Sequence, residues 1–179
     1  MEEGQETFLE KAKKTDVVLF IPGDPLTATT HIDLVFEAKR KRIPVKIIHN
    51  ASIFSAIGET GLQIYKFGKT ATIPLNGRLE NVKSTIKENK KLGLHTLLLL
   101  DIDNETNLHM TVKDALKLLL KTKLVKEFDE IVVFSNAGGE SEIHYKAAKE
   151  FLIKEINLPA VLIIPGKLHF RERDFLELF

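Results

Sequence analysis

The chain has 179 residues, with 26 basic and 25 acidic side chains and a formal net charge of +1. This balance offers no concentrated basic face for nucleic acid, and the absence of cysteine excludes disulfides, thiolate catalysis and cysteine-ligated zinc. No apolar run approaches the roughly 20 residues that span a bilayer, and the acidic start is unlike a secretory signal. We therefore expect a cytoplasmic protein with no membrane or nucleic-acid partner.

Six short apolar runs predict buried strands. They are Val17–Ile21, Val45–His49, Thr70–Pro74, Thr96–Ile102, Ile131–Ser135 and Ala160–Ile164. Helical periodicities lie around and between them, at Phe8–Ala12, Ile32–Ala38, Val82–Leu92, Thr111–Leu119 and Ser141–Ile156. Strands that alternate with helices predict an α/β protein with mainly parallel sheets. The turn after Pro74 divides it into two small domains, residues 1–74 and 75–179.

Two loops of the first domain follow predicted strands, where open α/β sheets bind ligands. The loop at residues 21–31 holds Asp24 between two prolines. Its carboxylate is either a ligand contact or the acceptor of a tight turn in its own backbone. The loop at residues 49–58 either offers N–H groups to a ligand at a helix start or shows ordinary capping by Asn50 or Ser52.

Two further loops follow strands of the second domain. Residues Ser135–Ser141 are mostly small but match neither the dinucleotide-binding nor the phosphate-loop pattern. The loop Ile164–His169 contains Lys167, which is either a functional cation or a solvated one. The six histidines lack a paired metal-binding spacing and no serine lies in a nucleophile elbow, so we expect neither a metal nor a hydrolase triad. The residues alone predict a ligand crevice at the strand ends and leave the catalytic residue unknown.

Several segments, in a consistent order along the whole chain, resemble the diphthine synthase family. One is Pro22-Gly23-Asp24-Pro25-Leu26 followed by Ala28-Thr29-Thr30-His31, of which Pro-Gly-Asp-Pro is shared with the broader tetrapyrrole-methylase-like superfamily. The others are Ser52–Ala56, Gly61–Lys69, Gly93–Leu98, Leu100–Ile102, Met110–Thr111 and Pro165–His169.

The resemblance implies a homodimer of two-domain chains that bind S-adenosylmethionine in a cleft between the domains. It also implies methylation of the amino nitrogen of the modified histidine on translation elongation factor 2, a step of diphthamide biosynthesis. Such a transfer is an in-line displacement that depends mainly on orientation and needs no metal. At matching positions, the expected cofactor contacts, several of them through the backbone, are Asp24, Thr27, Ser52, Ile53, Leu100, Ala137 and Ala160.

The chain departs from the family at two positions and at its start. Ala160 stands where a histidine is common, and Asn136 where a basic residue is common. The family opens with a strand and a glycine-rich loop, whereas here only a short helix precedes the Pro-Gly-Asp-Pro strand. We therefore expect a truncated first domain, in a shortened variant, one half of a split enzyme or a truncated reading frame. The alternatives are an inactive or partner-dependent cofactor-binding remnant and another tetrapyrrole methylase-like methyltransferase.

Overall fold

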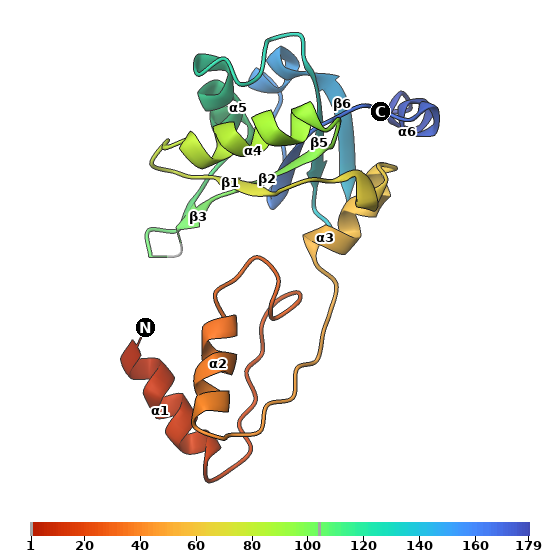
Figure 1. Cartoon of the computed structure of the whole chain (residues 1–179). Coiled ribbons are helices and arrows are strands. Elements are labelled where there is room, and N and C mark those ends of the chain that lie inside the picture. The colour runs from red at the N-terminus through yellow and green to blue at the C-terminus, as the bar shows by residue number, and fades with distance from the viewer. Residues whose placement is uncertain (1, 104) are drawn as a thin grey trace. The chain divides into compact units, whose positions relative to one another are not determined.

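The computed structural model describes residues 2–103 and 105–179 (Figure 1). The chain forms two compact units, Met1–Ile53 (unit 1) and Phe54–Phe179 (unit 2). This division falls earlier in the chain than the predicted domain boundary after Pro74. The reason is that residues just after Ile53 belong to the packing of unit 2, where Ile57 and Leu62 are buried.

Unit 1 contains two helices, α1 (Glu2–Ala12) and α2 (Ile32–Arg40). Its core is small: Leu9 of α1 packs with Ala38 of α2 and with Ile43 beyond the end of that helix. The Ile43 N–H donates to the Ala38 carbonyl and so satisfies one of the acceptors at the helix end. The two helices confirm the predicted periodicities around Phe8–Ala12 and Ile32–Ala38.

The two strands predicted in unit 1 are not formed. Residues Val17–Ile21 and Val45–His49 run as chain without regular secondary structure (Figure 1). Among the described residues, no backbone–backbone hydrogen bond involves either segment. The prediction was wrong because a strand needs a neighbour to complete its ladder of hydrogen bonds, and an apolar run alone does not supply one.

Unit 2 is built on a five-stranded sheet of order β1-β2-β7-β5-β6 and carries a separate hairpin of β3 and β4. The sheet strands are β1 (Ala71–Ile73), β2 (Thr96–Leu100), β5 (Glu130–Ser135), β6 (Glu142–Ala147) and β7 (Ala160–Ile164). The hairpin strands are β3 (Ile102–Asp103) and β4 (Leu108–His109). The helices are α3 (Ile53–Ala56), η1 (Ile57–Thr60), η2 (Ile64–Lys66), α4 (Glu80–Lys91), α5 (Val112–Lys121), η3 (Ala148–Leu152) and α6 (Phe170–Leu176).

The sheet is mixed, which corrects the expectation of a mainly parallel one. In the described part of the chain, β1 and β2 are its parallel neighbours, and the pairs β2–β7, β7–β5 and β5–β6 are antiparallel. The helix predicted at Ser141–Ile156 is also wrong, because β6 and the short η3 occupy that stretch. Alternating apolar and polar residues from Ile143 to Lys146 have the two-residue period of a strand, and β5 and β6 pair over their full lengths.

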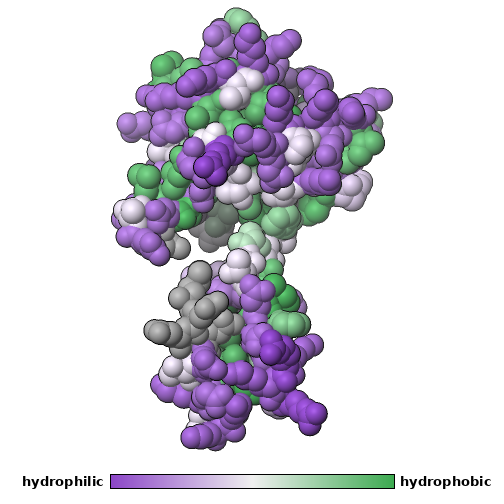
Figure 2. Space-filling view, turned by 60° about the vertical axis from the view of Figure 1, so that its left-hand side comes forward, coloured by the Kyte–Doolittle hydropathy of each residue, from purple (hydrophilic) through white to green (hydrophobic). Residues whose placement is uncertain are grey.

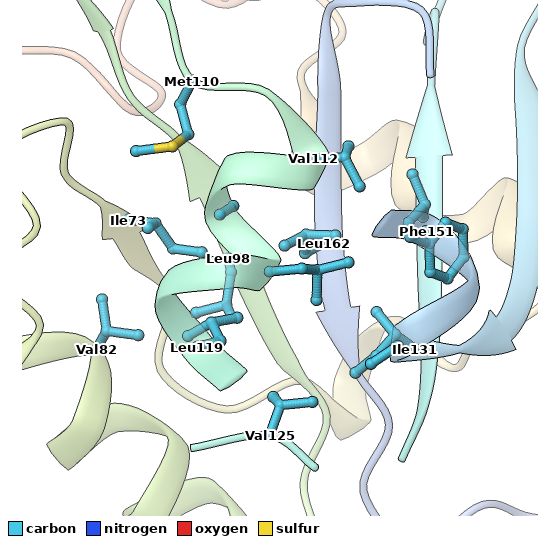
Figure 3. Close-up of a cluster of buried hydrophobic side chains, with 14 of the residues drawn as sticks. Ile73, Val82, Leu98, Met110, Val112, Leu119, Val125, Ile131, Phe151 and Leu162 are labelled. Carbon is cyan, nitrogen blue, oxygen red and sulfur yellow. The ribbon is translucent and has the colours of Figure 1, made fainter. Parts of the chain in front are cut away.

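The core of unit 2 lies between the sheet and helices α4 and α5 (Figure 3). Leu98 of β2 and Leu162 of β7 are fully buried against Leu119 of α5, and Val82 comes from α4. The opposite face of the sheet is covered as well, since Leu97 of β2 is also buried. Among the described residues, no helix has both the length and the apolar character that a membrane span requires.

Candidate functional site

Asp24 connects the two loops of unit 1 that were predicted to follow strands. Its Oδ1 accepts hydrogen bonds from the Leu26 N–H (2.9 Å) and the Thr27 hydroxyl (3.1 Å). Its Oδ2 lies 2.8 Å from Nδ1 of His49 and accepts from the Asn50 N–H at 3.3 Å. The side chain is only 9% exposed. Asp24 therefore forms the tight turn in the first loop through Oδ1, and its Oδ2 bonds to the second loop.

These hydrogen bonds stabilise the ionised form of Asp24. The bond from the Leu26 N–H, followed by the contact with His49, lowers the pKa of Asp24 to about 2. A carboxylate has about four lone-pair sites, and the four described partners use both oxygens. Asp24 thus holds the loops in place through its side chain, and the predicted cofactor contact at this position remains a prediction.

The first loop has two further fixed points. Gly23 has a φ of +77°, a left-handed conformation that favours glycine, and a Cβ there would lie 3.5 Å from the Ala51 carbonyl oxygen of the second loop. Nδ1 of His31 lies 3.1 Å from the Pro25 carbonyl oxygen and 2.8 Å from the Thr29 hydroxyl. Since a carbonyl oxygen only accepts, a hydrogen on Nδ1 satisfies that contact. The His31 ring therefore connects the end of this segment back to Pro25 at its beginning.

Ser52 and Ile53 follow the second loop, where α3 begins at Ile53. Both side chains are half-buried, as is Thr27 in the first loop. Asp24, Thr27, Ser52 and Ile53 therefore all belong to unit 1, and the Asp24 carboxylate bonds directly with Thr27. The remaining predicted cofactor contacts lie in unit 2.

In unit 2, the three predicted cofactor contacts lie at the same end of three neighbouring inner strands of the sheet. β2 ends at Leu100, and β7, which runs antiparallel to it, begins at Ala160. On the other side of β7, β5 ends at Ser135 directly opposite Ala160 and leads into Ala137. The Asn136 N–H donates to the Pro159 carbonyl oxygen at 2.9 Å and closes this corner. Leu100 and Ala160 are half-buried against the core, and Ala137 is exposed.

A buried polar atom borders this edge. The Ser135 side chain is 1% exposed, and its Oγ has no hydrogen-bond partner among the described residues. Such a group costs roughly 1–3 kcal/mol when buried without a partner. Unpartnered buried polar groups in native proteins call for a reason, such as strain, a catalytic role or a bound water or ion. Ser135 was part of a loop that the sequence marked, but nothing in the sequence signalled its burial.

Asp101 was missed as a site residue by sequence reasoning, although it directly follows Leu100. Its Oδ2 accepts from the Leu75 N–H at 3.0 Å, and its Oδ1 from the Ile102 N–H at 3.0 Å. Its backbone carbonyl accepts from the Met110 N–H at 2.9 Å. Asp101 thus connects the residues that follow β1, β2 and β4 at this end of the sheet. A polar residue at the end of an apolar strand was the signal that could have found it.

Three segments that carry the resemblance in unit 2 meet around a buried carboxylate, Glu172 of α6; they are Gly61–Lys69, Gly93–Leu98 and Pro165–His169. Its Oε1 accepts from the Gln63 N–H at 2.9 Å and lies 3.1 Å from Nε2 of His95. Its Oε2 accepts from the Lys66 ammonium group and from the His169 N–H at 2.7 Å. The Glu172 side chain is 1% exposed. This group of residues, called the Glu172 network below, fixes α6 to η2 and to the start of β2.

Protonation states in the Glu172 network follow from its hydrogen bonds. Nδ1 of His95 accepts from the Gly166 N–H at 2.9 Å, so Nε2 carries the hydrogen that points to Glu172. Burial lowers the pKa of His95 and keeps the ring neutral. Burial alone raises the pKa of Glu172, but hydrogen bonds led by that from Lys66 outweigh it and hold the pKa at about 2. The carboxylate is therefore ionised.

Lys167, left open as a functional or a solvated cation, contributes to this network through its backbone. Its carbonyl oxygen accepts from Lys66 at 2.7 Å, and its N–H donates to the Gly93 carbonyl oxygen at 2.9 Å, while its side chain is exposed. Gly166 is required beside it, because a Cβ there would lie 2.4 Å from the Gly93 carbonyl oxygen. The Pro165–His169 segment thus has a structural role in unit 2.

The sheet with its covering helices is that of an α/β protein, and its similarity to known proteins assigns it to the methylases. The family described as Tetrapyrrole (Corrin/Porphyrin) Methylases matches residues 1–150. Diphthine synthase of Methanocaldococcus jannaschii is 43% identical over 182 residues, covering 94% of this chain and 71% of the relative. Diphthine synthase of Methanococcus maripaludis is 42% identical over 180 residues with the same shares.

Solved structures agree with this assignment. A crystal structure of diphthine synthase matches with a TM-score of 0.90 and 35% identity, covering 99% of this chain and 71% of that chain. The chain therefore belongs to the diphthine synthases, within the tetrapyrrole methylase family. This membership confirms the predicted α/β methyltransferase class and implies a methyl donor of the S-adenosylmethionine type.

Proposed function

We propose that this chain binds S-adenosylmethionine and transfers its methyl group to the modified histidine of translation elongation factor 2, in the cytoplasm. The observation that carries the proposal is the convergence of Leu100, Ala137 and Ala160 at one edge of the sheet, next to the buried, unpartnered Oγ of Ser135. These residues fit the cofactor because small and apolar side chains leave room for a flat ring.

S-adenosylmethionine supplies a methyl group on a positively charged sulfur; an unprotonated amine forms the new nitrogen–carbon bond in line with the carbon–sulfur bond that breaks, and S-adenosylhomocysteine leaves with that electron pair. The contribution of the chain is binding and orientation. In unit 1, the ionised Asp24 keeps the two loops that contain Thr27 and Ser52 at a fixed separation. In unit 2, Asp101 and the bond from Asn136 to Pro159 fix the sheet edge. We assign no general base to any residue.

Titration of the chain with S-adenosylmethionine tests the binding. Ala160→Phe is expected to weaken the affinity at least tenfold, about 1.4 kcal/mol, because the ring fills the ligand-accessible edge. Ala147→Phe is the matched control: Ala147 is also half-buried and ends β6 at the opposite end of the strands. Asp24→Ala is expected to weaken binding by loosening the loops. Absence of binding by the parent chain would favour the remnant hypothesis instead.

Methyl transfer is tested separately with labelled cofactor and two forms of elongation factor 2, with and without the histidine modification. Label that enters only the modified form supports the proposal. Transfer to neither form, together with measurable cofactor binding, would leave a cofactor-binding protein without this substrate. Label on a tetrapyrrole would support the alternative superfamily activity, against which the identities to diphthine synthases argue.

The chain is also proposed to form a homodimer. Supporting this, apolar side chains are exposed on two elements that the Glu172 network holds together: Tyr65 of η2 is 82% exposed and Phe170 of α6 is 62% exposed. Exposed aromatic residues are enriched at protein interfaces. Sedimentation equilibrium is expected to give a dimer, and Tyr65→Glu to shift it toward monomer. A parent chain that stays monomeric at all concentrations would overturn this proposal.

A further inference from the structure

β6 is an edge strand of the sheet in unit 2. It pairs with β5 on one side, and within the described part of the chain no strand pairs with its other side (Figure 1). The Ala148 N–H donates to the Asp129 carbonyl oxygen at 2.9 Å, in register with the β5–β6 ladder. Because residues of an antiparallel strand bond to alternate sides, Ile143 and Tyr145 direct their N–H and C=O groups away from β5. The free edge therefore presents two donors and two acceptors.

Side chains of opposite charge lie near the two ends of this strand. Glu142 and Lys146 project from the same face of the sheet as His144, because side chains of a strand alternate between its faces. Lys146 is exposed, and its ammonium group makes no ion pair among the described residues. Figure 2 shows a surface that is mainly hydrophilic (purple), with apolar side chains (green) between. A partner for such an edge must supply complementary charge as well as backbone groups.

We propose that β6 pairs antiparallel with β6 of a second copy of this chain, about a two-fold axis at His144. In this register Glu142 lies opposite the partner's Lys146, and Lys146 lies opposite the partner's Glu142. Ile143 and the partner's Tyr145 exchange two backbone hydrogen bonds, and the two-fold axis repeats this pair. On the other face of the sheet, the same two residues form an aromatic and β-branched pair, a favourable cross-strand combination. Every outward backbone group of Ile143 and Tyr145 thus gains a partner.

Other registers satisfy fewer of these conditions. Hydrogen bonds form only where outward-facing residues lie opposite one another, so the axis falls on a residue of β6. An axis at Tyr145 sets His144 opposite the partner's Lys146 and leaves Glu142 beyond the partner strand. An axis at Ile143 pairs only three residues of β6. The axis at His144 pairs five residues and sets opposite charges against each other twice.

A second copy fits this edge better than other occupants. A lysine on an edge strand commonly prevents association, but here each Lys146 meets a carboxylate. An unrelated extended peptide can use the backbone groups, but the two-fold axis repeats the charge match only for a second copy. The contact lies on a different element from Tyr65 and Phe170, so it is separate from the proposed homodimer contact and joins dimers at high concentration. It requires neither methyl donor nor methylation.

Disulfide trapping tests this register, because the chain has no cysteine of its own. At the axis the two Cα atoms form a non-hydrogen-bonded pair about 4.5 Å apart, within the range of a disulfide. His144→Cys is oxidised with diamide at about 200 μM, in a chain that also carries Tyr65→Glu. Ala147→Cys is the matched control: it is also half-buried on β6, but its counterpart lies about 20 Å away in this register. His144→Cys is expected to give about tenfold more covalent dimer than Ala147→Cys.

Charge reversal tests the same register without a covalent bond. Lys146→Glu creates two like-charge pairs and is expected to raise the dissociation constant of the Tyr65→Glu chain about tenfold. Adding Glu142→Lys makes both pairs opposite in charge again and is expected to restore the dissociation constant. Sedimentation equilibrium measures the association, and equal melting temperatures show that each variant is folded.

Three outcomes would overturn the proposal. One is the absence of a disulfide in His144→Cys. A second is equal trapping of His144→Cys and Ala147→Cys, which indicates random collision. The third is a folded Lys146→Glu variant that associates as well as its parent, or a double reversal that restores nothing. Because Tyr65→Glu removes the other proposed contact and no step uses S-adenosylmethionine, these readouts are independent of the proposed function.

Discussion

Replacing Glu172 with alanine is expected to destabilise unit 2 more than any surface change. The substitution leaves the Lys66 ammonium group, the Nε2 hydrogen of His95 and the N–H groups of Gln63 and His169 without their acceptor. Removing one partner of a buried ion pair costs about 3–5 kcal/mol. With an m-value of about 2 kcal/mol per M, the midpoint of urea unfolding falls by about 2 M.

Two variants separate charge from shape in this experiment. Glu172→Gln keeps the size and one acceptor oxygen, so we expect it to lose less stability than Glu172→Ala. Asp174→Ala lies on the same helix, and its side chain is 58% exposed, so a change within about 0.5 kcal/mol is expected. If Glu172→Ala unfolds at the same urea concentration as Asp174→Ala, the network does not stabilise α6 and the reasoning fails.

The pH dependence of stability provides a second assay of the same network. The pKa of His95 lies below its ordinary value of 6.5 in the folded chain, so the unfolded chain binds that proton first and stability falls as the pH drops below 6.5. The pKa of Glu172 is about 2, against an ordinary value of 4.5, so a further loss follows as the pH falls below 4.5. In Glu172→Ala the loss below pH 4.5 is expected to disappear, whereas the loss due to His95 is expected to grow, because Glu172 raises the pKa of His95 and its removal leaves burial and Lys66 to lower that pKa further. Equal pH profiles for parent and variant would contradict this assignment.

Three further predictions concern packing and protection. Ser135→Ala is expected to leave the melting temperature unchanged or raise it, because the hydroxyl has no described partner. Thr60→Val is expected to cost about 1 kcal/mol of stability, because the buried Thr60 hydroxyl donates to the Ile57 carbonyl at 2.7 Å. A lower melting temperature for Ser135→Ala would show that the hydroxyl has a partner in the folded chain. Gly166→Ala is expected to cost about 1–3 kcal/mol of stability through overpacking. Gly58→Ala is expected to be nearly neutral, because its Cβ meets only the flexible end of a side chain at 3.4 Å. Chemical denaturation of the two variants compares their stabilities. Amide exchange is expected to be faster throughout unit 1 than in the sheet of unit 2, and uniform protection across both units would show that unit 1 is a stable domain by itself.

Local signals in the sequence predicted the elements whose structure is decided locally. The strand Ala160–Ile164 was predicted with its observed bounds. The start of α5 was predicted as well: the Thr111 hydroxyl accepts from the Asp114 N–H at 3.1 Å, which is the N-cap bond that those two residues indicate. The stretch Ser141–Ile156 failed because its helical spacing competes with a two-residue alternation, and pairing with β5 decided the outcome.

Contacts between residues far apart in the sequence could not be predicted in this way. Lys66, His95 and Glu172 belong to segments with no common spacing, and the folded chain alone brings them together. The resemblance pointed to the segments of Lys66 and His95 but not to that of Glu172, and it did not show that these residues form a structural ion-pair network. The burial of Ser135 is equally non-local, since it depends on the strands on both sides of β5.

The loops and the unpaired segments of unit 1 have different physical supports. The four partners of the Asp24 carboxylate come from residues 26, 27, 49 and 50, mostly beyond the ends of the two unpaired segments. The loops can therefore keep their shape without a sheet, whereas the described segments that lead into them make no backbone–backbone hydrogen bond. Ordering such a segment costs roughly 1–2 kcal/mol per residue in backbone entropy. A ligand that binds the loops and orders these segments bears this cost, so its affinity is lower than its contacts alone would give.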